Sequence, residues 1–167
     1  MFDPIHYGHL RTALELQELL GLETVAFVPA GDPPHRATPL ADAATRLAMV
    51  RAAIEGNSGF TADDRELRRA GPSYTVLTLE ELRAERPRQP LVLIMGLDAF
   101  AGIGSWHRAE ELVGLAHIVV AVRPGAAMPG SGLPAELLRR HRCLDPAQLG
   151  QAPAGRVLVN EGTQLVA

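Results

Sequence analysis

Two histidines near the start of the chain, His6 and His9, are the residues best suited to chemistry. They lie three positions apart where a helix is predicted to begin, so their rings can face the same way. A helix N-terminus offers free backbone amides and a partial positive charge, which suits an anion. Gly8, between the histidines, would let a phosphate approach the backbone. We interpret the two imidazoles as hydrogen-bond donors to a phosphate group that gains negative charge.

The spacing of these histidines also fits two other interpretations. Taken alone, a His-x-x-His pair favours one histidine that caps the helix and one that is exposed. Zinc is a further option because imidazole is a common zinc ligand. The neighbouring sequence lacks the set of carboxylates or thiolates that would complete a zinc site. The histidine pair therefore indicates phosphate binding only together with the residues around it.

Several other candidates for ligand binding lie in loops that follow predicted strands, or at the start of a predicted helix. They are His35, Arg36, Thr75, Asp98, Trp106, His107 and Arg123. Each has a structural alternative: a solvated turn for His35 and Arg36, and a surface turn for Arg123. Capping by Ser73 would explain the segment before Thr75, and core packing is the usual role of a lone tryptophan. The position of Trp106 in a Gly-rich loop beyond a strand favours a ligand instead.

The elements that must position these residues follow from the hydrophobic periodicity of the chain. Predicted helices cover residues 7–20, 39–55, 74–85, 106–113 and 133–142, and predicted strands cover 24–28, 60–62, 91–95, 117–122 and 156–160. Thr38 is the expected cap of the second helix and Gly21 the expected stop of the first. Strands that alternate with helices predict a Rossmann-like α/β fold, a doubly wound parallel sheet with helices on both faces. Ligands bind beyond the carboxyl ends of such strands.

Composition limits the class of protein. With 47% hydrophobic and 21% charged residues, the chain has enough apolar material for a core. A net charge of −3 argues against a broad nucleic-acid-binding face. No apolar run approaches the length of a membrane span, and no signal peptide is visible. The single cysteine, Cys143, fits a reducing compartment, so we expect a cytoplasmic protein. The sequence leaves the oligomeric state open.

Residues 2–9, Phe-Asp-Pro-Ile-His-Tyr-Gly-His, resemble the signature of the adenylyltransferases that carry a His-x-Gly-His motif. Segments 28–36, 71–75, 94–106 and 122–125 narrow the resemblance to the nicotinate-nucleotide adenylyltransferase family. They contain Pro-Pro-His-Arg, Pro-Ser-Tyr-Thr, Gly-Leu-Asp with a later Ser-Trp, and Arg-Pro-Gly. The resemblance implies transfer of the adenylyl group of ATP to nicotinate mononucleotide, in NAD biosynthesis. Magnesium would arrive on the ATP phosphates, because no cluster of carboxylates could form a dedicated cage.

The resemblance also implies a role for each matching residue. His6 and His9 would bind the triphosphate and stabilise the transition state, and Phe2, Gly8, His35 and Arg36 would lie at the ATP phosphates. Nicotinate mononucleotide would contact the amides of Thr75 and His107, the carboxylate of Asp98, the indole of Trp106 and the guanidinium of Arg123. Many relatives carry tyrosine in place of His107, which matters little if only the backbone binds. Arg46 also matches an arginine of the family, although a local helix pair with Asp42 is the simpler interpretation.

Two pieces of the family pattern are absent from residues 1–167, which we otherwise expect to form a single nucleotidyltransferase domain. The first is an opening strand with a Gly-Gly-Thr turn, and the second is a C-terminal Ser-Ser-Thr-x-Ile-Arg region. Losing a central strand would leave two strand edges unpaired. We therefore expect this chain alone to be poorly stable and weakly active. The alternatives to the leading hypothesis are phosphopantetheine adenylyltransferase, of the same superfamily, and a non-catalytic nucleotide-binding remnant.

Overall fold

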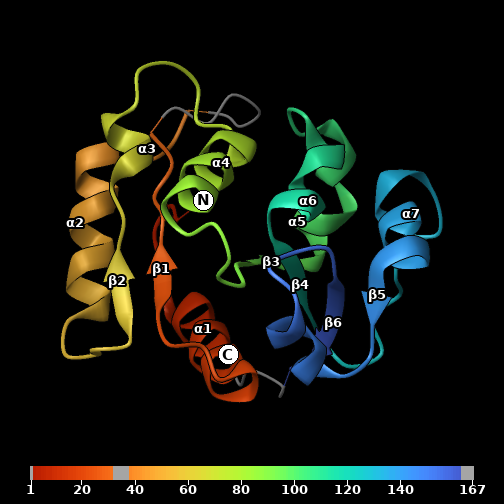
Figure 1. The fold of residues 1–167 in the computed structure, drawn as a ribbon. Coiled ribbons are helices and arrows are strands. Elements are labelled where there is room, and N and C mark those ends of the chain that lie inside the picture. The colour runs from red at the N-terminus through yellow and green to blue at the C-terminus, as the bar shows by residue number, and fades with distance from the viewer. Residues whose placement is uncertain (1, 32–37, 163–167) are drawn as a thin grey trace. The chain divides into compact units, whose positions relative to one another are not determined.

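A computed structural model of the chain describes residues 2–31 and 38–162 (Figure 1). Its contacts divide the protein into two compact units, Met1–Tyr74 and Thr75–Ala167, and each is described by itself. The prediction that residues 1–167 form one domain stays a prediction.

The described residues of the first unit form three helices and two short parallel strands. In chain order these are α1 (Tyr7–Leu20), β1 (Val25–Phe27), α2 (Ala43–Ile54), β2 (Phe60–Ala62) and α3 (Arg65–Arg68). The register of the strand pair places Val25 opposite Phe60 and Phe27 opposite Ala62. Helix α1 has the predicted bounds and ends at Gly21, which has a left-handed φ of 63°. Glycine adopts that conformation without a steric penalty, so it stops the helix.

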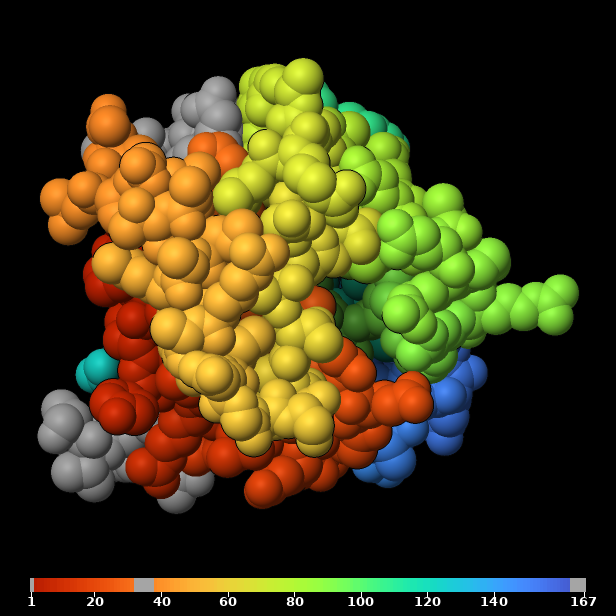
Figure 2. Space-filling view, turned by 90° about the vertical axis from the view of Figure 1, so that its left-hand side faces the viewer, coloured from red at the N-terminus to blue at the C-terminus, as the bar shows by residue number. Residues whose placement is uncertain are grey.

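Helix α2 begins four residues later than predicted. Its cap is Asp42, whose side chain accepts a hydrogen bond from the amide of Thr45 at 2.7 Å, and Thr38 is not its cap. Asp42 can do this because its backbone is extended, as a helix cap requires. Residues 38–41 therefore form part of the loop before the helix. Figure 2 looks onto the outer side of α2, which covers much of this face of the first unit in orange.

The core of the first unit joins α1, α2 and the two strands. Ala13, Val25, Phe27, Val50, Ile54 and Phe60 are buried together, and Phe2, Ile5 and Leu10 pack against them. Burial of this apolar surface stabilises the segment that leads into α1 as well as the helix itself. The histidine segment is thus attached to a packed core.

The second unit contains a four-stranded sheet and its helices. Its helices are α4 (Thr75–Glu85), α5 (Leu97–Ala101), α6 (Leu112–Leu115) and α7 (Gly132–His141), and its strands are β3 (Val92–Gly96), β4 (His117–Val122), β5 (Arg142–Cys143) and β6 (Val157–Glu161). Three 3-10 segments join them: η1 (Ile103–Ser105), η2 (Ala109–Glu111) and η3 (Pro146–Gln151). Residues 106–108 form a turn, so the helix predicted over 106–113 is wrong in its first half.

All neighbouring strands of this second sheet are parallel, in the order β3-β4-β6-β5. Strand β4 is one of its two interior strands, and its residues Ile118, Val119 and Val120 are inaccessible to solvent. Such near-continuous apolar strands are typical of parallel sheets covered on both faces. The prediction of a Rossmann-like α/β fold with parallel strands and helices is confirmed.

The strands that the structure describes fall into two sheets. Within the described residues β1 pairs with β2, and β3 pairs with β4, so each of β1 and β3 has a strand neighbour on one side. None of the helices in 2–31 and 38–162 has the length and apolar character needed to cross a membrane.

Candidate active site

The loop before α1 places His6 and His9 side by side. Their rings stack with centroids 3.8 Å apart and planes inclined by 24°. His6 is the cap of α1, with an extended backbone. Its Nδ1 accepts a hydrogen bond from the amide of Gly8 at 3.1 Å, and Nδ1 of His9 accepts one from the amide of His6 at 3.2 Å. The structure therefore brings together the two residues that the sequence singled out.

These backbone bonds determine which ring nitrogens carry a proton. A backbone amide can only donate, so Nδ1 is the acceptor in both rings. A neutral imidazole then carries its proton on Nε2. The turn thus gives an Nε2–H donor on each of two neighbouring rings, an arrangement suited to phosphate oxygens. The same two side chains form the capping box of α1 through Nδ1 and keep a donor at Nε2.

His9 is held in its neutral form. Its partial burial, followed by the nearby His6, lowers the pKa of His9 from 6.5 to about 4. Burial favours the neutral imidazole because a charge is poorly solvated there, and a second imidazolium alongside would repel it. At neutral pH His9 is therefore an uncharged donor.

Phe2 supports the histidine pair from the core side. Its ring meets that of His9 edge to face, with centroids 5.0 Å apart, and lies 5.7 Å from the ring of Phe27. Phe27 in turn lies 5.1 Å from Phe60. Aromatic rings prefer such edge contacts, so this chain of rings fixes the orientation of His9 from β1 and β2.

The backbone amides at the start of α1 are less free than the sequence suggested. The amide of Gly8 donates to His6 Nδ1, and the amides of His9 and Leu10 donate to the carbonyl of His6 at 3.0 and 3.3 Å. An anion at this corner would therefore depend more on the imidazole donors than on the backbone. The binding role of Gly8 stays a prediction.

Asp3 is a residue of this corner whose role the sequence reasoning missed. Its carboxylate accepts hydrogen bonds from the amides of Leu40 at 3.0 Å and Ala41 at 3.3 Å. These bonds join the loop before α1 to the loop before α2. The signal in the sequence was the position of Asp3 inside the 2–9 motif.

Arg46 makes two contacts that the sequence reasoning did not foresee. Its side chain, 1% exposed, donates from Nε to the carbonyl of Ala41 at 3.1 Å and from Nη1 to that of Ala30 at 2.6 Å. These bonds add to the expected interaction with Asp42, where a hydrogen bond from a backbone amide, and then the charge of Arg46, lower the pKa of the carboxyl. Arg46 thus joins the two ends of the loop that carries His35 and Arg36, which themselves lie outside the described residues.

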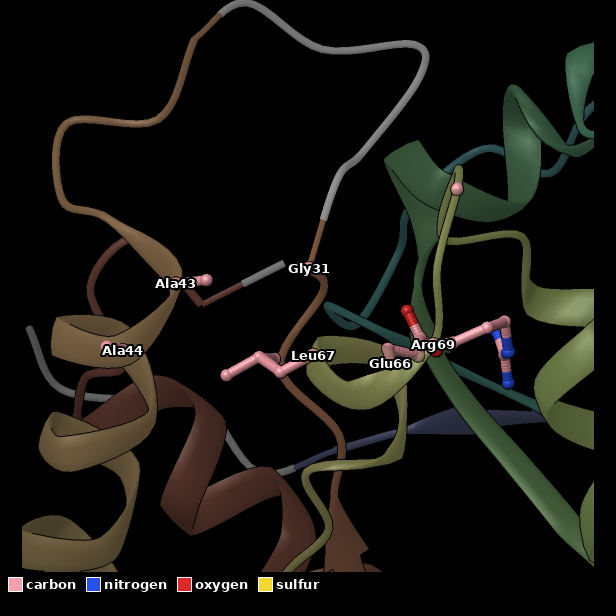
Figure 3. Close-up of a pocket in the computed structure, with 7 residues that line it drawn as sticks. Gly31, Ala43, Ala44, Glu66, Leu67 and Arg69 are labelled. Carbon is pink, nitrogen blue, oxygen red and sulfur yellow. The ribbon is translucent and has the colours of Figure 1, made fainter.

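A pocket of about 530 Å³ lies in the first unit near the start of the same loop. It is lined by Gly31, Ala43, Ala44, Glu66, Leu67, Arg69 and Gly71. Figure 3 shows Leu67 pointing toward α2 and Arg69 pointing away from it. Gly31 fits closely against α3, since a Cβ there would lie 2.5 Å from the carbonyl oxygen of Glu66. The amide of Gly31 donates to Ser73 Oγ at 2.9 Å, so Ser73 also holds this loop.

The residues predicted to bind nicotinate mononucleotide all belong to the second unit. Thr75 is the first residue of α4, as a contact through its amide requires. Asp98 lies in the first turn of α5, directly after β3, and is exposed. Arg123 is exposed and directly follows β4. Because parallel strands end at one edge of a sheet, Asp98 and Arg123 follow neighbouring strands at the same edge.

Trp106 and His107 lie in the turn between η1 and η2. Trp106 is partly buried and His107 is exposed. The amide of Trp106 donates to the carbonyl of Ile103 at 3.0 Å, which ends η1. Ile103 is fully buried, so the turn starts from a fixed point in the core. A half-exposed indole on such a turn is suited to stacking on a planar ring.

Comparison with known proteins agrees with this description. Residues 1–155 match the protein family described as cytidylyltransferase-like. Two similar proteins are named probable nicotinate-nucleotide adenylyltransferase. The one from Aeromonas hydrophila is 48% identical over 93% of this chain and 73% of its own length, and that from Methylococcus capsulatus is 46% identical over 98% and 79%.

A solved structure has the same fold at lower identity. It is the Plasmodium falciparum nicotinic acid mononucleotide adenylyltransferase complexed with NaAD, with a TM-score of 0.70 and 18% identity over 98% of this chain and 72% of that one. The fold, the paired histidines and the family match together define a cytidylyltransferase-like nucleotidyltransferase. At the identity and coverage of its relatives, the chain belongs to the nicotinate-nucleotide adenylyltransferase family.

Proposed function

We propose that this protein transfers the adenylyl group of ATP to nicotinate mononucleotide, a step of NAD biosynthesis. A phosphate oxygen of nicotinate mononucleotide attacks the α-phosphorus of ATP, and the bond between the α-phosphorus and the bridging oxygen breaks. The products are nicotinate adenine dinucleotide and pyrophosphate. The observation that carries the proposal is the stacked His6–His9 pair of the family's signature motif. Nδ1 of each ring accepts a backbone hydrogen bond, so Nε2–H is the donor available to a phosphate.

The histidines act by electrostatic stabilisation. Phosphoryl-type transfer needs positioning and compensation of charge on the non-bridging oxygens more than covalent help from the protein. The neutral imidazole suits this role because its Nδ1 accepts the backbone hydrogen bond that holds the ring while its Nε2–H can donate to an anion. His9 is half-buried and neutral, so we assign it to the reacting α-phosphate. His6 is exposed, and we assign it to the outer phosphates.

The remaining residues bind and orient the two nucleotides. Phe2 orients His9 through its ring, Gly8 completes the phosphate-binding turn, and His35 and Arg36 supply further donors. The amides of Thr75 and His107 receive the nicotinate carboxylate, since backbone amides at a helix start or a turn suit an anion.

Three side chains of the second unit complete the binding of nicotinate mononucleotide. Trp106 stacks on the pyridine ring, Asp98 accepts from a ribose hydroxyl, and Arg123 binds a phosphate with its planar fork. This division of roles agrees with the exposure of Asp98, His107 and Arg123.

We propose that Mg²⁺ takes part as the partner of ATP. Within the described residues no group of three or more histidine, cysteine or acidic side chains could hold a metal ion. The cation would therefore be held mainly by the triphosphate and water, as is usual for magnesium. Its chemistry is to neutralise charge on the phosphate oxygens.

A pyrophosphate-release assay tests the proposal. The protein is supplied with MgATP and, in separate reactions, nicotinate mononucleotide, nicotinamide mononucleotide or phosphopantetheine. We expect release with nicotinate mononucleotide, and formation of nicotinate adenine dinucleotide in equal amount. Preference for phosphopantetheine would favour another adenylyltransferase of the superfamily, and nucleotide binding without any turnover would favour a non-catalytic protein. Fractionation of cells tests the expected cytoplasmic location.

A further inference from the structure

Arg108 follows the Trp106–His107 turn with an unusual backbone conformation. Its φ is 50° and its ψ is 42°, and among the described residues it is the non-glycine residue with a positive φ. In that region Cβ crowds the following carbonyl oxygen, so residues other than Asn, Asp and Gly rarely occupy it. Surrounding contacts must therefore hold Arg108 in place.

Two carboxylates hold its guanidinium. Nε and Nη2 of Arg108 donate to the two carboxylate oxygens of Glu111, the second at 3.1 Å, and Nη2 also donates to Oε1 of Glu80. The contact with Glu111 is a two-pronged arrangement, which fixes geometry as well as charge. The same contact lowers the pKa of the Glu111 carboxyl.

These contacts connect the turn to helix α4. Glu80 lies about 7.5 Å along the helix from Thr75, given five residues at the usual rise. The far end of α4 is held by Arg83, whose guanidinium donates to the carbonyls of Leu115 at 2.7 Å and Pro153 at 2.8 Å. Arg108 thus supplies a polar tie between the Trp106–His107 turn and the half of α4 that starts with Thr75.

The apolar core holds helix α4 beside the segment that follows the turn. Val76 and Leu79 of α4 are buried, as are Ala109 and Leu112 after the turn. The hydrogen bonds of Arg108 add a polar link from the turn itself to α4. Within the turn the amide of Glu111 donates to the carbonyl of Arg108 at 3.0 Å. That bond closes the turn locally but does not connect it to α4.

We propose that Arg108 is a positioning residue for the recognition of nicotinate mononucleotide. Through Glu80 and Glu111 it holds the indole of Trp106 and the amide of His107 in a fixed relation to the amide of Thr75. The ring and the carboxylate of the ligand then meet a preformed set of contacts. The identity of the ligand in this inference rests on the proposed function. The ordering of the turn by Arg108 does not depend on it.

The test uses Trp106, the only tryptophan of the chain, as an intrinsic probe. Acrylamide quenching of its fluorescence reports the order of the turn in the free protein. Titration with nicotinate mononucleotide reports affinity, and steady-state kinetics separate KM from kcat. The variants are Arg108→Ala, Arg108→Gly, Arg108→Lys, Glu80→Gln and Glu111→Gln. Glu110→Gln is the matched control, since Glu110 is exposed and adjoins Glu111.

We expect Arg108→Ala and Glu80→Gln to raise the quenching constant about twofold and Kd for nicotinate mononucleotide roughly tenfold, as for loss of a charged hydrogen bond. KM for this substrate should rise with Kd while kcat changes little, because the residue acts on ground-state binding. Arg108→Lys keeps the charge without the planar fork and should recover part of the affinity. Glu110→Gln should match the unmodified protein.

Arg108→Gly separates the side chain from the backbone, because glycine adopts a positive φ without strain. We expect it to resemble Arg108→Ala, since the tie to α4 is lost in both. A glycine variant with normal quenching and affinity would overturn the inference, as would equal effects of Glu80→Gln and Glu110→Gln. If the unmodified protein binds no nicotinate mononucleotide, the proposed function fails, and the quenching comparison still decides whether Arg108 orders the turn.

Discussion

At the scale of single residues, the histidine pair has a structural role beside the chemical role that we propose for it. Each Nδ1 accepts a backbone hydrogen bond at the start of α1, so Nε2–H is the donor that we propose for a phosphate. A side chain that only caps the helix could be replaced by asparagine, which is a strong helix cap. Replacement by asparagine would remove Nε2–H and leave amide donors on a shorter side chain. The two roles of His6 can therefore be separated experimentally.

We expect the two histidines to differ in their effect on catalysis. His9→Ala should lower kcat by roughly 10²–10³, the usual effect of losing a donor to developing charge. His6→Asn should keep the cap, and with it the stability of the protein, while KM for ATP rises. Steady-state kinetics with varied ATP check both. Near-equal losses of turnover and of ATP affinity in the two variants would contradict the division of roles.

Gly31 is a second position where a single residue matters. A Cβ at Gly31 would lie 2.5 Å from the carbonyl oxygen of Glu66, a backbone atom that cannot move alone. We expect Gly31→Ala to lower the free energy of unfolding by about 1–3 kcal/mol, as overpacking does. Urea denaturation measures the change. Gly114→Ala is the matched control, because beyond its own helix backbone and chain neighbours a Cβ there would meet none of the described atoms within 4 Å. Its effect should be small.

At the scale of elements, the loop between β1 and α2 is held at both ends by distant side chains. Arg46 of α2 holds the carbonyls of Ala30 and Ala41, and Asp3 holds the amides of Leu40 and Ala41. A buried guanidinium is costly to desolvate unless its donors are used. The hydrogen bonds of Arg46 to the two loop carbonyls therefore offset the free energy of desolvating its guanidinium.

Removal of the Arg46 guanidinium tests this loop closure. Arg46→Met keeps much of the apolar stem but leaves two carbonyls without their donor, and an unsatisfied buried group costs about 1–3 kcal/mol. We expect lower stability and a higher KM for ATP. The lysine of Arg46→Lys can reach one carbonyl. Its stability and its KM for ATP should therefore lie between those of the unmodified protein and Arg46→Met. Stability and KM that are both unchanged in Arg46→Met would show that the loop closes without it.

At the scale of the whole molecule, each compact unit contains a histidine that the fold keeps neutral. In the first unit this histidine is His9, and in the second it is His117, which is 0% exposed. Burial lowers the pKa of His117, whose Nε2 bonds the carbonyl of Ala152 at 2.7 Å. Its Nδ1 accepts from the amide of Arg156 at 3.1 Å, so protonation would break that bond.

The protein should therefore lose stability in mild acid. A histidine whose pKa is lowered by folding binds its proton more readily in the unfolded chain, where the pKa is near 6.5. Its stabilising effect is complete above that pH and declines as the pH falls, for His9 toward about 4. We expect the urea midpoint to fall between about pH 7.5 and 5. His117→Gln, which can both donate and accept without charge, should weaken that dependence, and an unchanged dependence would contradict the assignment.

Much of the fold was predictable because its signals are local. Helix α1, strands β2 and β4 and the stop at Gly21 follow from hydrophobic periodicity and from the conformational freedom of glycine. The start of α2 was misplaced because Thr38 and Asp42 are both good caps, and only the bond to Thr45 distinguishes them. The turn at 106–108 was taken for helix because its positive φ at Arg108 depends on contacts beyond the local sequence.

The sequence by itself determined the family, the parallel α/β class and the paired histidines, because these depend on residue type and short spacing. The tertiary structure decided which nitrogen of each imidazole accepts a backbone hydrogen bond, and where Asp3, Arg46 and Arg108 find their partners. Asp3 lies 37 residues from Leu40, and Arg108 lies 28 residues from Glu80. Periodicity carries no information on such distant pairs, since only packing of the intervening elements brings the chain segments together.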